Sequence, residues 1–141
     1  MQISFARTAS PITSKVVIAY DDDGNEAVGF KIVGPDSPQY RAEQERQRLE
    51  GLKRRINGGK KPKDFKSEEA QAELDRLTQE NLTRNAVAVV VDWFGFKDGD
   101  IDVPFDAAML PEFFAAHQSW RDKVVDAIYQ EDAFLPKPAK G

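Results

Sequence analysis

Apolar and polar residues alternate along residues 14–33, which is the pattern of strands rather than of a helix. The run 14-SKVVIAY-20 is rich in β-branched and aromatic residues, and in 26-EAVGFKIV-33 the apolar Val28, Phe30 and Ile32 alternate with their neighbours. The turn-forming cluster 21-DDDGN-25 separates the two runs. The pattern predicts a β-hairpin over residues 13–33, with an apolar face that later parts of the chain must cover.

A charged helix is expected after the break 34-GPDSP-38. Ser37 can cap this helix, with Pro38 in the first helical position. The residues that follow are strong helix formers, and their few apolar members form a narrow stripe: Tyr40, Leu49, Leu52 and Ile56. The glycines of 57-NGG-59 end the helix. We therefore predict a mostly solvated helix over residues 37–56.

A second, longer helix is expected from Ser67, with Glu68 and Glu69 in its first turn, where acidic residues suit the helix dipole. Its apolar stripe consists of Ala70, Leu74, Leu77, Leu82, Ala86, Val89, Val90 and Trp93. Residues 86–91 could instead be a buried strand, because valine is β-branched. The helix is favoured because no turn signal separates this run from Leu82, and Asp92 with Trp93 is predicted to end it.

The stretch 92-DWFGFKDGDIDVPFD-106 is interpreted as a connector in which Gly99 allows the chain to reverse. Asp106 is expected to cap a helix over residues 107–117, in which Pro111 starts a new turn or bends the helix. Ser119 is expected to cap a last helix over residues 120–132. The sequence thus predicts an α+β fold that is mainly α, with an N-terminal β-hairpin followed by helices.

The chain organisation follows from these elements. Its 141 residues suit one domain, which we place at residues 13–132. Residues 1–12 are predicted to be a flexible arm and residues 133–141 a flexible tail. Residues 57–66 are predicted to be a basic linker, and residues 67–132 a C-terminal helical bundle.

The cysteine content, the net charge and the length of the apolar runs exclude several classes of function. The chain has no cysteine, which excludes disulfides, thiolate zinc sites and cysteine nucleophiles. Its net charge of −4 creates no global field that indicates nucleic acid or a membrane as a partner. The longest apolar run, residues 86–91, is too short to span a bilayer. We therefore expect an intracellular protein without a membrane partner or a cofactor.

No catalytic or metal-binding pattern emerges from the acidic turns. Asp98, Asp100 and Asp102 alternate as in a calcium loop, but an EF-hand needs Gly at position six and Glu at position twelve. Counted from Asp98, those positions hold Val103 and Met109. Counting from Asp21 gives Glu26 and Ile32, so that turn fails as well. His117 is the only histidine, and no nucleophile, phosphate or dinucleotide motif is present. The prediction is a protein that is not an enzyme.

A basic segment spans Lys53 to Lys66, which contains seven Lys or Arg residues and one acidic residue, Asp64. Such a segment could contact phosphates. It carries only Phe65 as an aromatic residue, and no nucleic-acid-binding motif surrounds it. The favoured interpretation is a solvated helix end and linker, with nucleic-acid binding as the alternative.

Aromatic residues are dense in the C-terminal part of the chain: Trp93, Phe94, Phe96, Phe105, Phe113, Phe114, Trp120 and Tyr129. The primary interpretation is a small core in which these side chains pack together. Their surplus also indicates a protein-binding surface, because Trp and Tyr are favoured as anchors there. The candidate protein-binding residues are Trp93, Phe113, Phe114, Trp120 and Tyr129.

A set of residues between 86 and 132 has the spacing of a known family: Asp92, Trp93, Gly99, Val103, Pro104, Phe105, Leu110, Val125 and Tyr129. On these residues, the segment 86–132 resembles the tail assembly chaperones of long-tailed bacteriophages and prophages. Residues 24–48 are similar to companion segments of such proteins, where a strand pair precedes a Gly-x-Asp-Ser-Pro break and a charged helix.

The resemblance implies a non-enzymatic protein that binds the tape measure protein, and possible tail tube subunits, in the host cytoplasm. Such proteins keep the tape measure soluble until the tube forms, and they are typically absent from the finished particle. The charged helix is a candidate for self-association. The alternatives are a minor tail or head–tail protein retained in the virion, and a nucleic-acid-binding accessory protein that uses residues 53–66.

Overall fold

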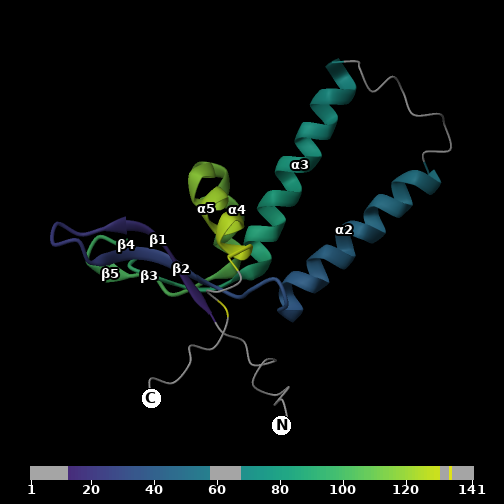
Figure 1. The fold of residues 1–141 in the computed structure, drawn as a ribbon. Coiled ribbons are helices and arrows are strands. Elements are labelled where there is room, and N and C mark those ends of the chain that lie inside the picture. The colour runs from purple at the N-terminus through teal and green to yellow at the C-terminus, as the bar shows by residue number, and fades with distance from the viewer. Residues whose placement is uncertain (1–12, 58–67, 131–133, 135–141) are drawn as a thin grey trace, which may run out of the picture.

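The predicted hairpin forms, and a third strand joins it (Figure 1). A computed structural model of the chain describes residues 13–57, 68–130 and 134. Strand β1 spans Ser14–Tyr20 and pairs antiparallel with β2, Glu26–Ile32. In the turn, the carboxylate of Asp21 accepts hydrogen bonds from the backbone N–H groups of Asp23 and Asn25, at 2.9 and 2.8 Å. The predicted arm 1–12, the linker residues 58–66 and most of the predicted tail lie outside the described residues.

The prediction that the second long helix continues to Trp93 is wrong. Helix α3 spans Glu68–Val89, and the chain then passes directly into strand β3, Val90–Phe94. Strand β3 pairs antiparallel with β2, and a bulge shifts the register between Lys31 and Ile32. The free edge of β2 supplies backbone hydrogen-bonding partners that the local sequence does not reveal, and β-branched valines suit a strand. The strand alternative for residues 86–91 is thus right for its last two residues.

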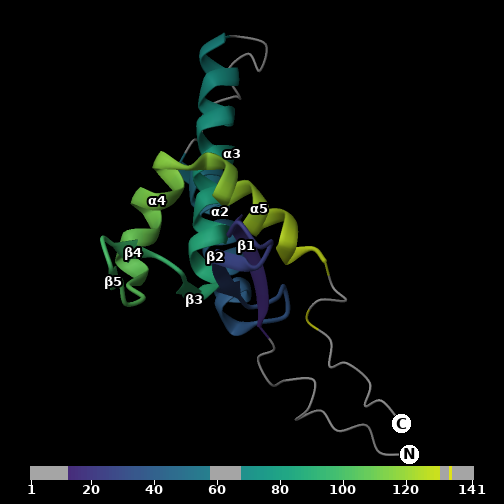
Figure 2. The same ribbon diagram turned by 90° about the vertical axis from the view of Figure 1, so that its left-hand side faces the viewer.

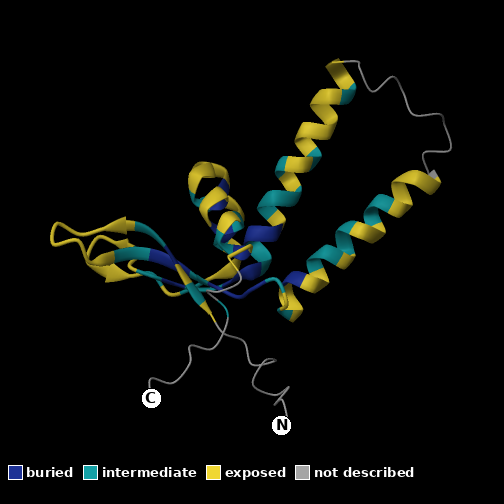
Figure 3. Cartoon of the chain, viewed as in Figure 1, coloured by how far each residue is buried: buried dark blue, intermediate teal, exposed yellow. Residues whose placement is uncertain are grey.

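Two long helices, α2 and α3, project from the sheet and separate toward their outer ends (Figure 1). Helix α2 spans Pro38–Asn57. The Tyr40 backbone N–H donates to the Ser37 hydroxyl at 3.2 Å, which confirms Ser37 as the predicted cap. The outer parts of both helices are largely exposed (Figure 3). The prediction of a charged, mostly solvated helix is confirmed.

The acidic connector folds as a second, small hairpin. Strand β4, Lys97–Asp98, pairs with β5, Ile101–Asp102. Gly99 has a φ of +64° in the turn between them, which confirms the predicted reversal. Strands β4 and β5 thus lie in the predicted connector, for which the sequence indicates a reversal but no paired strands. Strand β3 begins within the predicted second helix.

The Asp106 cap forms as predicted, because its carboxylate accepts from the Ala108 backbone N–H at 3.0 Å. The 3-10 helix η1, Ala107–Met109, follows, and Pro111 lies in the first turn of α4, Leu110–Ala116. Pro111 therefore starts a new turn, which is one of the two predicted outcomes.

The Ser119 cap is wrong, because α5 spans Gln118–Ile128 and so begins two residues before the predicted start at Trp120. It also ends before the predicted limit at residue 132, with Tyr129 as its C-cap. His117 occupies the N-cap position without a side-chain cap bond. Its backbone N–H bonds to the Phe113 carbonyl, and its carbonyl accepts from Trp120. His117 is thus both the C-cap of α4 and the N-cap of α5, so Ser119 lies inside α5 rather than at its cap.

The core lies between one face of the three-stranded sheet and the helices α3, α4 and α5 (Figure 2). It contains Val16, Phe30, Ile32, Val33, Tyr40, Ala86, Val89, Val90, Trp93, Leu110, Phe114, Val124 and Ile128. Burial of this apolar surface drives the packing of the helices on the sheet. The α+β, mainly α fold class is confirmed. Within the described residues, no helix combines the length and the apolar character needed to cross a membrane.

Candidate protein-binding surfaces

Five aromatic side chains continue the core outward and form an aromatic cluster: Trp93, Phe96, Phe105, Phe113 and Trp120. The Phe96 and Phe113 rings are stacked, with 5.3 Å between their centroids. The indole of Trp93 meets the Phe105 ring edge-on at 5.0 Å, and its N–H donates to the Val103 carbonyl at 2.9 Å. Such ring contacts add to the free energy gained from burial alone.

The five predicted binding residues do not form one surface. Trp93 and Phe114 are core side chains, so neither presents its ring to solvent. Phe113 and Trp120 are half-buried and form the outer part of the aromatic cluster. Tyr129 is 62% exposed, and it lies nine positions after Trp120, which is about two and a half helical turns. Tyr129 therefore faces away from the cluster.

His117 lies against Trp120 with parallel rings, whose centroids are 3.7 Å apart. The sequence singled out both residues but gave no reason for them to meet. They meet because His117 caps α5, which brings its side chain beside the first turn of that helix. The stack extends the aromatic cluster from Trp120 to the exposed His117.

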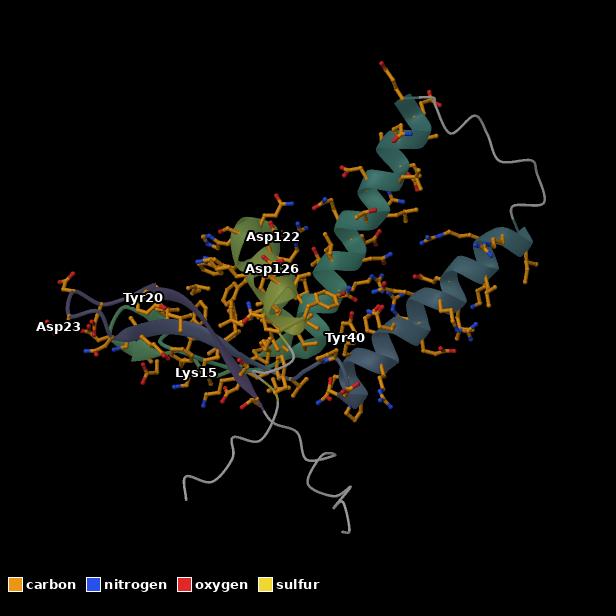
Figure 4. All side chains as sticks on the ribbon, in the orientation of Figure 1. Lys15, Tyr20, Asp23, Tyr40, Asp122 and Asp126 are labelled. Atoms are coloured by element: carbon orange, nitrogen blue, oxygen red, sulfur yellow. The ribbon has the colours of Figure 1, made fainter. Side chains whose placement is uncertain are left out.

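Helix α2 is attached to the rest of the protein through polar contacts. The Tyr40 and Tyr129 hydroxyls are hydrogen-bonded at 3.0 Å, and Tyr40 lies where α2 meets the body (Figure 4). The amides of Gln44 and Gln47 both donate to Asn85 Oδ1, each at 2.8 Å. Sequence reasoning missed this junction. Its one signal was Asn85, a polar residue within the apolar end of α3.

The junction makes stability depend on pH. Burial raises the pKa of Tyr40 to about 12, and the hydrogen bond with Tyr129 acts in the same direction. A tyrosine in the unfolded chain titrates near pH ~10. Because the folded state holds the proton to higher pH, the contribution of Tyr40 is fully present below pH ~10. It is lost as the pH rises through about 12.

We therefore expect the free energy of unfolding of Tyr40→Phe to fall less than that of wild type between pH ~10 and ~12. Urea unfolding measured across this range checks the result. Tyr20→Phe is the matched control, because Tyr20 is exposed at the end of β1, where Figure 4 labels it. Parallel curves for wild type and Tyr40→Phe would contradict the expectation.

Helix α2 carries an exposed apolar stripe, which we define as Leu49, Leu52 and Ile56. Their exposed fractions are 46%, 39% and 77%. The sequence grouped Tyr40 with them, and that grouping is wrong. Tyr40 lies nine positions before Leu49, a rotation of about half a turn beyond two full turns, so it faces the opposite way. Tyr40 is buried at the junction and the apolar stripe is turned outward.

Charges along α2 are distributed unevenly. In its first part, Arg46 bonds to Glu43 and Glu50, each at 2.6 Å. Arg48 likewise pairs with Glu45 at 2.6 Å. The bond from Arg46 lowers the pKa of Glu50. The last part contains Lys53, Arg54 and Arg55 and no acidic residue. The outer end of α2 is therefore basic.

Only residues 53–57 of the basic segment 53–66 lie within the described residues. Lys53, Arg54 and Arg55 are exposed there. Nucleic-acid binding by this segment stays a prediction.

The acidic turns lie on the surface at the strand ends. Asp21, Asp22, Asp23, Asp98, Asp100 and Asp102 are all exposed. In the part of the chain that the structure describes, no group of three or more His, Asp or Glu side chains is arranged to hold a metal ion. Figure 4 shows Asp23 at the far tip of the first hairpin.

The chain was compared with protein-family models, with curated proteins and with solved structures, and none of the three comparisons gives a match. The candidate surfaces therefore rest on the residues and their geometry.

Proposed function

We propose that this protein is a phage tail assembly chaperone. It binds the tape measure protein in the host cytoplasm and keeps it soluble until the tail tube forms around it. The observation that carries the proposal is the pair of projecting helices, α2 and α3, on which Leu49, Leu52, Ile56 and Leu74 are exposed. Exposed apolar side chains of this kind form a surface suited to protein binding.

The physical requirement of the client fits this surface. A long helical protein with apolar faces associates with itself unless another surface covers those faces. An amphipathic helix is covered by packing its apolar residues, spaced three and four apart, against a complementary apolar surface. The half-buried Phe113 and Trp120 offer a second contact area. The resemblance of residues 86–132 to tail assembly chaperones supports the same assignment.

Co-expression tests the proposal. We expect the full chain to raise the soluble fraction of a tape measure fragment several-fold and to co-purify with it. A double substitution, Leu49→Gln with Leu52→Gln, is expected to reduce both effects, because it makes the exposed stripe polar. Tyr20→Gln, which alters an exposed aromatic residue at the opposite end of the molecule, is the control. A fragment that stays insoluble with wild-type protein would refute the proposal.

Purified particles distinguish this proposal from a structural protein of the virion. A chaperone is expected to be absent or far below stoichiometric amounts in mass spectrometry of complete tails. Stoichiometric presence would favour the minor tail or head–tail protein instead.

A further inference from the structure

We infer that the exposed apolar stripe of α2, bordered by Lys53 and Arg55, docks an amphipathic helix whose apolar residues are flanked by carboxylates. The inference rests on the proposed function, because it names the chemistry of the helix that the chaperone would bind. It also assigns the contact to one face of one helix.

The stripe is continuous, and its side chains are exposed rather than packed against the other described residues. Leu49, Leu52 and Ile56 are spaced three and four apart, so they form one row along about two turns. All three are exposed. Each leucine or isoleucine left in water forfeits the free energy of burial that a docked apolar side chain would recover.

The stripe points away from α3. Gln47 marks the side of α2 that faces α3, because its amide bonds to Asn85. Leu49 follows Gln47 by two positions, a rotation of about 200°, which places it on nearly the opposite side. The partner helix of the same chain therefore does not cover the stripe.

The charge around the stripe selects an acidic occupant. Lys53 lies three positions before Ile56, and Arg55 lies three positions after Leu52, so the two cations border the stripe on opposite edges. Neither has an ion pair within the described residues, whereas Arg46 and Arg48 are already paired with acids of α2. A docked helix with carboxylates beside its apolar residues would meet both cations.

A second copy of the chain fits less well. Two α2 helices packed stripe to stripe would bring Lys53 and Arg55 of both copies together, and like charges disfavour such an interface. Helix α3 is acidic, but its exposed Leu74 lies about three turns before Asn85 and so on the side that faces its own α2. A separate acidic helix satisfies both the apolar and the charge requirement.

The test uses the full chain and two fluorescent synthetic peptides. Both have leucines spaced three and four apart, and the flanking positions are Glu in one peptide and Lys in the other. Fluorescence anisotropy is expected to show binding of the Glu peptide, weakened by salt, and no binding of the Lys peptide. Leu52→Gln is expected to lower the affinity for the Glu peptide at least about tenfold, as for a residue at the centre of an interface. The double variant Lys53→Glu with Arg55→Glu is expected to prefer the Lys peptide.

Two control variants keep the test specific. Ile101→Gln changes an exposed isoleucine of β5, away from both projecting helices, and Lys123→Glu changes an exposed lysine on α5. Both are expected to bind the Glu peptide as wild type does. Circular dichroism melting curves of every variant separate a lost surface from a lost fold.

Four results would overturn the inference. The first three are equal binding of both peptides, no binding of the Glu peptide, and an unchanged affinity in Leu52→Gln. The fourth is binding of the wild-type protein to phosphatidylserine vesicles that Leu52→Gln abolishes. A doubled mass in light scattering that Leu52→Gln returns to the monomer would assign the stripe to a second copy instead. If wild-type protein solubilises the tape measure fragment but does not bind the Glu peptide, only this inference is refuted. If it binds the peptide but not the fragment, only the proposed function falls.

Discussion

Gly95→Ala is expected to abolish cooperative folding or to displace β3, whereas Gly24→Ala is expected to cost only about 1–2 kcal/mol. Both glycines have a φ of +82°, so alanine is strained at both positions. They differ in their surroundings. A Cβ atom at Gly95 would lie 1.8 Å from the Ala27 carbonyl oxygen, and one at Gly24 would meet nothing within 4 Å.

The clash at Gly95 involves the backbone of β2, which cannot yield as a flexible side chain can. Moving it would disturb the pairing of β2 with β3, on which Phe30 and Trp93 depend for their position. Urea unfolding followed by far-ultraviolet circular dichroism measures both variants. We expect a loss above about 4 kcal/mol for Gly95→Ala, in the range reserved for severe core or backbone disruption. Equal losses for the two glycines would contradict this account.

Phe30→Ala is expected to destabilise the protein by about 3–5 kcal/mol. The Phe30 side chain is fully buried at the centre of the sheet. Its ring lies 5.4 Å from Phe96, 5.5 Å from Phe114 and 6.2 Å from Trp120. Truncation leaves a cavity that these rings cannot close without losing their own contacts.

Chemical denaturation followed by tryptophan emission measures the effect, because Phe30 contacts Trp120 and pairs across the sheet with Trp93. Tyr20→Ala on the same hairpin is the control, and an exposed position of this kind is expected to change stability by less than about 0.5 kcal/mol. A loss below about 1 kcal/mol for Phe30→Ala would show that the sheet and helices do not share one core.

The candidate surfaces were only partly predictable. The spacing of Leu49, Leu52 and Ile56 is visible in the sequence, but their direction is not. Direction depends on which side of α2 meets α3, and that side is set by Gln44 and Gln47 through their bonds to Asn85. Glutamines on a charged helix give no sequence signal for such a contact.

The aromatic residues illustrate a similar limit. Composition predicts that most of them pack together, and the aromatic cluster confirms it. Phe113 and Phe114 are adjacent in sequence, yet only Phe114 is fully enclosed. Neighbouring helix positions point about 100° apart, so the placement of α4 against the core decides which ring is covered.

The sequence by itself determined the elements that depend on nearby residues. The Asp21–Asn25 turn, the Ser37 and Asp106 caps and the reversal at Gly99 each involve groups a few positions apart, so short-range patterns reveal them.

Only the tertiary structure decided where α3 ends and which faces are covered. Val90 becomes a strand residue because the free edge of β2, distant in sequence, offers backbone partners. The valine run alone fits a buried helix or a buried strand. Likewise, Tyr40 is buried and Leu49 exposed because the body meets α2 on one side. Both outcomes depend on strand pairing and packing between segments that are distant in sequence, and a local sequence pattern does not show such contacts.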